Sequence, residues 1–150
     1  MMTNQMMIGL LVLSGIRVLS AGPAHPQERP SHAPPAMTLA NLQGILKETV
    51  ENLKGESGQW RFTYAGVEMA LLTSLPHDRM RIVAPIGPEV QLTDQQRKRM
   101  LEANFHSALD VRYATSNGRV YAAYIHPLSP LHREEIQSAL RQAAELVKTF

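Results

Sequence analysis

The 150-residue chain contains no cysteine. Disulfides, thiolate zinc sites, iron–sulfur clusters and cysteine nucleophiles are therefore all excluded. The chain also lacks an apolar run of the roughly 20 residues that a transmembrane helix needs, so no stable membrane span is expected. A strong excess of one charge is missing as well, because 15 Lys and Arg residues are balanced by 13 Asp and Glu residues. This near-balance does not favour nucleic acid as a partner.

Sequence motifs of catalysis and cofactor binding are also missing. The chain has no Gly-x-Ser-x-Gly elbow, no His-Glu-x-x-His pair, no Walker loop and no Gly-x-Gly-x-x-Gly turn. We therefore predict that the protein is not an enzyme, with no catalytic residue, no cofactor and no resident metal. What is present, 44% hydrophobic and 19% charged residues, is the composition of a globular domain.

The N-terminal segment has the pattern of a secretory signal peptide. An apolar run from Met6 to Ile16 is followed by small residues from Ser20 to Ala24. We expect residues 1–24 to be removed on export, which makes the mature protein periplasmic or secreted. No Lys or Arg precedes the apolar run, and the alternative is a cytoplasmic protein whose N-terminus is not cleaved.

A proline-rich stretch follows the predicted signal peptide. Five of the ten prolines lie between Gly22 and Met37. Proline removes backbone donors and opposes helix formation, so residues 25–37 are predicted to be an extended, solvated linker. The single folded domain is expected to occupy residues 38–150.

Hydrophobic periodicity in this domain predicts three helices and five strands. Thr38 can cap a first helix that runs to about Lys54 and ends at Gly55 and Gly58. Apolar alternation predicts that Trp60, Phe62 and Tyr64 form one core-facing side of a strand. The remaining predicted elements are strands at 67–74, 79–84, 111–115 and 119–126, a helix at 93–104, and a final helix capped by Ser129-Pro130. Hairpin turns such as Asn117-Gly118 make the sheet antiparallel, so the fold class is α+β in the order α-β-β-β-α-β-β-α.

Three short segments carry a resemblance to a known family. They are Leu101-Glu102-Ala103-Asn104-Phe105, the strand pair around Asn117-Gly118, and His126-Pro127-Leu128-Ser129. With the element order, they resemble the type III secretion chaperone-like fold, which includes class I secretion chaperones and YbjN-type proteins. The resemblance implies a non-enzymatic homodimer that holds an extended segment of a protein partner on apolar sheet and helix surfaces. The identity of that partner is not implied.

The predicted second helix supplies candidate residues for the dimer. Met100, Leu101 and Phe105 are the apolar residues that we expect at a homodimer interface. Asn104 is expected to close the helix in a left-handed conformation, and Phe105 to fold back onto the core. Both residues would then be structural.

Two other classes of function compete with the protein-binding module. His126 and His132, joined by Glu135, could form a zinc site in an exported enzyme or metal binder, although this spacing is not an established ligand pattern. Arg97, Lys98 and Arg99 could hold a phosphate or nucleic acid. These three consecutive helical residues fan out over about 200°, however, so a solvated helix face is the favoured interpretation.

Overall fold

A computed structural model describes residues 35–150 of the chain. The predicted signal peptide and most of the predicted linker lie outside the described residues. The elements are α1 (Leu39–Thr49), β1 (Glu51–Glu56), β2 (Gln59–Tyr64), β3 (Val67–Ser74), the short 3₁₀ helix η1 (Leu75–His77), β4 (Arg79–Pro88), η2 (Glu89–Gln91), α2 (Asp94–His106), β5 (Arg112–Ser116), β6 (Arg119–Pro127) and α3 (Arg133–Lys148).

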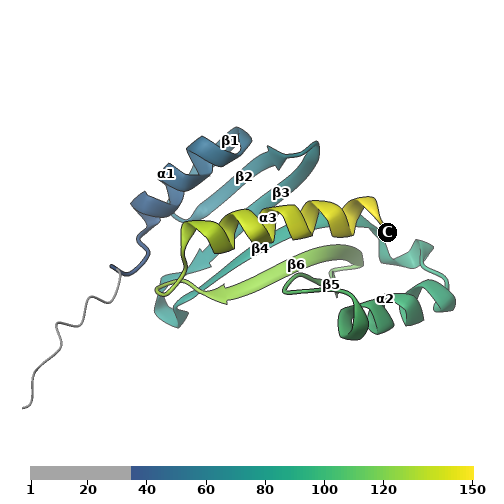
Figure 1. Cartoon of the computed structure of the whole chain (residues 1–150). Coiled ribbons are helices and arrows are strands. Elements are labelled where there is room, and N and C mark those ends of the chain that lie inside the picture. The colour runs from purple at the N-terminus through teal and green to yellow at the C-terminus, as the bar shows by residue number, and fades with distance from the viewer. Residues whose placement is uncertain (1–34) are drawn as a thin grey trace, which may run out of the picture. The chain divides into compact units, whose positions relative to one another are not determined.

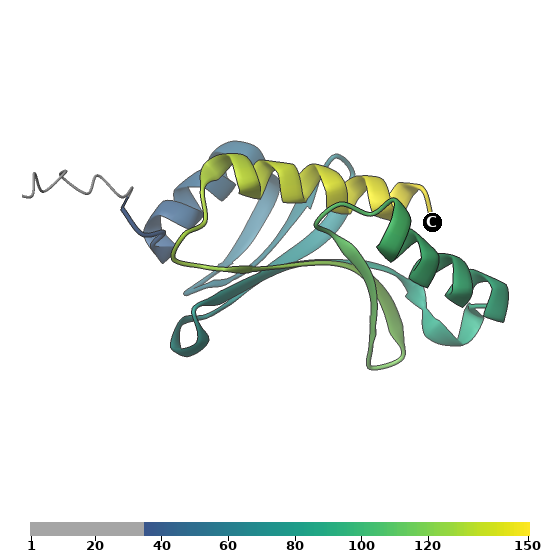
Figure 2. The ribbon, with the colours of Figure 1, turned by 60° about the horizontal axis from the view of Figure 1, so that its bottom comes forward.

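The strands form one antiparallel sheet in the order β1-β2-β3-β4-β6-β5. Helices α1 and α3 lie across one face of this sheet (Figure 1), while α2 lies beside the β5–β6 hairpin. Figure 2 shows that none of the three described helices covers the opposite face. The α+β class and the three helices are confirmed, but the sheet has six strands and not five.

The extra strand is β1, so the prediction of a first helix that continues to about Lys54 is wrong. Helix α1 ends at Thr49 because Val50 adopts an extended conformation. The chain continues as β1 and then reverses direction, so that β2 pairs with β1 antiparallel. Gly55 does not end a helix but occupies a position with φ of +101°, where a Cβ atom would lie 2.2 Å from the Gln59 carbonyl oxygen. Ser57 and Gly58, both with positive φ, form the hairpin turn. This pair of left-handed residues matches the right-handed twist of the two strands.

The core lies between the sheet and the pair α1 and α3. Alternate residues of β2, β3, β4 and β6 point into it, as the period of two requires. The predicted core residues Trp60 and Phe62 are buried. Helix α3 contributes Ile136, Ala139, Leu140, Ala143 and Ala144. Within residues 35–150, no helix is long and apolar enough to cross a membrane.

The start of α3 differs from the prediction. His132 is the N-cap residue, and its backbone N–H donates to Glu135 Oε2 at 2.7 Å. Ser129, the predicted cap, instead bonds to the Asp78 carboxylate in the turn between β3 and β4. Ser129 therefore bonds to a residue 51 positions away in the sequence and does not cap the helix.

Candidate partner-binding surfaces

The first candidate surface is the face of the sheet that α1 and α3 leave uncovered. Strand register places small or apolar residues of three neighbouring strands in one row across this face: Ala70, Val83 and Ala123. In the next row Arg81 lies between Leu72 and Ile125, whose exposed fractions are 37% and 58%. The core side chains point the other way, so these residues are available for a partner.

A depression of about 770 Å³ hollows this uncovered face near β1 and β2. Lys54, Arg61 and Arg119 line it, and Glu68 is the one carboxylate among its lining residues. None of these four side chains makes an ion pair within the described part of the chain. The face therefore combines apolar contact area with a net positive charge, which suits a segment that carries acidic side chains.

The second candidate surface is an apolar ridge on α2, formed by Leu101 and Phe105 and continued by Leu109. Leu101 and Phe105 are four residues apart and therefore lie on the same side of the helix. Their exposed fractions are 71% and 84%, and that of Leu109 is 68%. The prediction that Phe105 folds onto the core is thus wrong. Met100, which was expected at the dimer interface with these residues, is buried and does not belong to the ridge. Helix periodicity identified an apolar face here, but it could not tell a core face from an exposed one.

Asn104 is structural, but not by the predicted route. It lies within α2 and is not among the residues with positive φ. Its side-chain amide donates to the Tyr113 carbonyl at 3.0 Å, and its Oδ1 accepts the Tyr113 backbone N–H at 2.8 Å. Asn104 therefore joins α2 to the outer edge of β5, as a neighbouring strand would.

The proposed histidine metal site is only partly assembled. His126 Nε2 lies 4.0 Å from Glu135 Oε1. His132 is the N-cap of α3, and its backbone N–H donates to the Glu135 carboxylate. No group of three or more His, Cys, Asp or Glu side chains within residues 35–150 could hold a metal ion. The structure thus brings two of the three candidate ligands together.

The basic residues of α2 are partly neutralised by carboxylates. Arg97 Nη1 pairs with Glu89 Oε1 at 3.0 Å, and Lys98 Nζ lies 3.7 Å from Glu102 Oε1. Arg97 also donates to the Glu89 carbonyl at 3.1 Å, which ties α2 to η2. These contacts favour a structural role for Arg97 over phosphate binding.

Comparison with known proteins gives matches by structure only. No family model matches the sequence, and no curated protein matches it. A chain in the crystal structure of the ExsC–ExsE complex superposes with a TM-score of 0.58 at 13% identity, covering 75% of this chain and 92% of that one. A chain in the structure of the HopA1–SchA chaperone–effector complex gives a TM-score of 0.52 at 11% identity, covering 71% and 94%.

Both neighbours cover most of the described domain and nearly all of their own chains. The domain therefore has the type III secretion chaperone-like fold, as the sequence resemblance predicted. At such low identity the likeness is one of fold, and the activity has to be argued from the surfaces of this chain.

Proposed function

We propose that the protein is a non-enzymatic binding module that holds an extended, acidic segment of a protein partner on the uncovered face of its sheet. The observation that carries this proposal is the combination of exposed Leu72 and Ile125 with unpaired basic side chains around the depression. The fold supports it, because one structural neighbour comes from a chaperone–effector complex.

Site-specific photocrosslinking tests the proposal. A benzophenone amino acid at position 72 or 125 should crosslink to a partner in the native host, and mass spectrometry should locate the crosslink in an acidic, extended segment. The same probe at Val90 is the matched control, since this apolar residue is 87% exposed but lies in η2, outside the proposed surface. Equal crosslinking from all three positions, or none from 72 and 125, would contradict the proposal.

The proposal includes export of the chain. Its support is the apolar run from Met6 to Ile16 with the small residues that follow it. N-terminal sequencing of the protein from a fractionated Gram-negative host should find a mature terminus between Ala21 and His25 in the periplasmic or secreted fraction. An intact Met1 in the cytosolic fraction would show that the segment is not a cleaved signal.

It also includes a homodimer, in which the exposed ridge of α2 is the interface. Leu101 and Phe105 would supply the contacts, whereas Met100, the third residue expected at the interface, is buried within the protomer. A dimer would cover apolar area that a monomer leaves in water.

A further inference from the structure

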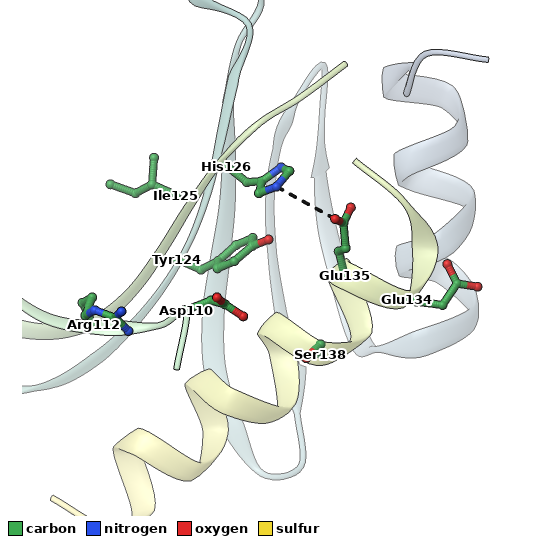
Figure 3. Close-up of a pocket in the computed structure, with 8 residues that line it drawn as sticks. All are labelled: Asp110, Arg112, Tyr124, Ile125, His126, Glu134, Glu135 and Ser138. Carbon is green, nitrogen blue, oxygen red and sulfur yellow. Dashed lines mark ion pairs between the residues drawn. The ribbon is translucent and has the colours of Figure 1, made fainter. Parts of the chain in front are cut away.

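A second hollow in the domain has a different charge from the sheet face. Strand β5 begins at Arg112, opposite Ala123, whereas β6 continues to Pro127. Beyond that pair, this part of β6 has β4 on one side and no described strand on the other. A cleft of about 490 Å³ opens there, between the end of β6 and the first turns of α3 (Figure 3).

Three carboxylates line this cleft: Asp110, Glu134 and Glu135. Arg112 also lines it, but its guanidinium donates to the backbone carbonyls of Leu109 and Val111 rather than to a carboxylate. Asp110 accepts a hydrogen bond from the neutral Gln142 amide at 3.1 Å. Of the three carboxylates, only Glu135 lies within 4.0 Å of a basic side chain among the described residues, the His126 imidazole, which pairs with it as an ion only when the ring is protonated. The three carboxylates outnumber the one guanidinium of the lining, so the cleft has a net negative charge.

Tyr124 adds a hydroxyl group to the cleft. The residue is only 6% exposed, and its hydroxyl makes no hydrogen bond with any described residue, which leaves the oxygen free to bond to a group in the cleft. Figure 3 shows the side chain reaching from β6 toward α3, with His126 above it and Asp110 below. Burial, followed by the charges of Glu135 and Asp110, raises the pKa of Tyr124 to about 12. The hydroxyl is therefore neutral near pH 7.

His126 presents a hydrogen-bond acceptor to the same cleft. Its Nδ1 lies 2.8 Å from the Pro127 carbonyl oxygen, which can only accept, so Nδ1 carries the proton. In the neutral ring Nε2 is then an acceptor, and it faces Glu135 Oε1, a second acceptor, across 4.0 Å. The rings of His126 and Tyr124 stack at 5.7 Å with planes 6° apart. The gap between the two acceptors suits a group that can only donate.

We propose that this cleft binds a guanidinium group, carried by an arginine side chain of a bound polypeptide. A guanidinium has a permanent positive charge and five N–H donors in one plane, and it stacks on aromatic rings. Glu134, Glu135 and Asp110 supply negative charge. His126 Nε2 and the Tyr124 hydroxyl supply acceptors, and the His126 imidazole supplies ring surface. The unpaired side of β6 beside the cleft can bond to the backbone of the polypeptide. This inference depends on the cleft residues and not on the partner proposed for the sheet face.

Titration of the full-length protein followed by NMR tests the inference. The probe is the capped tripeptide acetyl-Gly-Arg-Gly-amide, and the control has citrulline, which is neutral and nearly isosteric, in place of arginine. The arginine peptide should shift the resonances of Tyr124 and His126 at millimolar concentration, and its affinity should exceed that of the citrulline peptide at least about fivefold. The affinity of the arginine peptide should also decrease when the salt concentration is raised from 50 to 500 mM. Equal affinities would overturn the inference.

Variants of the cleft connect the shifts to its charges. The double variant Glu134→Gln, Glu135→Gln should lower the affinity about fivefold or more. Glutamine at position 135 keeps an acceptor for the cap of α3, so the helix start is preserved. Glu145→Gln is the matched control, because it removes one charge from the same helix outside the lining residues. An unchanged affinity in the double variant, or equal losses in variant and control, would contradict the assignment.

Two further arms identify the nature and the source of the ligand. Methylguanidinium alone should bind at least about threefold more weakly than the arginine peptide, because it lacks a backbone for the β6 edge; equal binding would point to a free small cation and against a polypeptide. Acetyl-Gly-Glu-Gly-amide should not bind, and a preference for this anionic peptide would overturn the charge argument.

Discussion

At the scale of single residues, Trp60 shows how the core tolerates an unsatisfied group. It is the only tryptophan of the chain and is 2% exposed. Its Nε1–H has no hydrogen-bond partner among the described residues. A buried donor without a partner costs about 1–3 kcal/mol, whereas burial of a large aromatic side chain contributes more. The packing of the ring therefore outweighs the unpaired donor.

Substitution of Trp60 can separate these two contributions. Trp60→Ala should lower the free energy of unfolding by about 3–5 kcal/mol, because it leaves a large cavity. Trp60→Phe keeps an aromatic ring and removes the unpaired donor, so its loss should stay below about 2 kcal/mol. Urea denaturation followed by circular dichroism measures both. If the Phe variant lost as much as the Ala variant, the indole N–H would have to be making a favourable contact.

Asp78 connects two loops that lie far apart in the sequence. Its carboxylate accepts the Ser129 backbone N–H and the Ser129 hydroxyl, both at 2.7 Å. These two hydrogen bonds, the hydroxyl first, lower the pKa of Asp78 from its ordinary value of 3.8. A carboxyl whose pKa is lower in the folded state stabilises that state above the unfolded pKa, and the effect is lost as pH falls through the folded pKa.

The pH dependence of Asp78→Asn follows from that sign. Asparagine also tolerates the left-handed conformation found here, with φ of 46°, so the backbone is not strained by the change. At pH 7 the variant should melt at a lower temperature than the unaltered protein, and the difference should shrink below pH 3.8. Glu51→Gln, an exposed change in β1, should show no comparable pH-dependent difference. A constant difference from pH 7 to pH 2.5 would refute the role of the charge.

At the scale of elements, one free edge of the sheet, that of β5, is partly capped by a side chain. β5 is an edge strand whose Tyr113 N–H and carbonyl point away from β6 and are both bonded by Asn104. An unpaired strand edge is a template for unwanted pairing with another chain. Asn104 thus protects part of this edge while it holds α2 in place.

Asn104→Ala tests this edge protection. Alanine is the best helix former, so a loss of stability cannot come from helix propensity. We expect a decrease of about 1–3 kcal/mol in the free energy of unfolding, because both backbone groups of Tyr113 lose their partner. Gln95→Ala, an exposed change on the same helix, should stay within about 0.5 kcal/mol of the unaltered protein. Equal stabilities of the two variants in urea denaturation would contradict this role.

The elements also show which parts of the fold were predictable. The meander and the Asn117-Gly118 hairpin depend on local alternation and turn residues, and both are present. Strand β1 was missed because five of its six residues are exposed, which leaves no alternation to detect. The start of α3 was misplaced because Ser129 bonds to Asp78, and a local pattern does not contain that distant contact.

At the scale of the whole molecule, the candidate surfaces depend on how the elements assemble. Phe105 lies in a periodic segment and was predicted to pack on the core, whereas Leu72 and Ile125 alternate with core residues along their strands. Whether each is exposed depends on which faces α1 and α3 cover and on where α2 lies. The cleft beside Tyr124 exists because β5 is shorter than β6. The exposure of these residues and the unequal lengths of β5 and β6 depend on contacts between segments far apart in the sequence. The sequence therefore predicted an apolar helix face and a partner-binding role, but not the positions of these surfaces.

The last prediction concerns the oligomeric state. Leu101 and Phe105 are more than two-thirds exposed on one side of α2, and burial of such apolar side chains in a symmetric contact favours a dimer. Light scattering of the full chain at tens of micromolar should give twice 16.7 kDa if the segment preceding the domain is retained. Phe105→Asp should give the monomer mass with an unchanged melting temperature for the domain fold, because the residue is outside the core. Val90→Asp, an equally exposed apolar site in η2, should remain dimeric. A monomeric unaltered protein, or a Phe105→Asp variant that still dimerises, would exclude the α2 ridge as the interface.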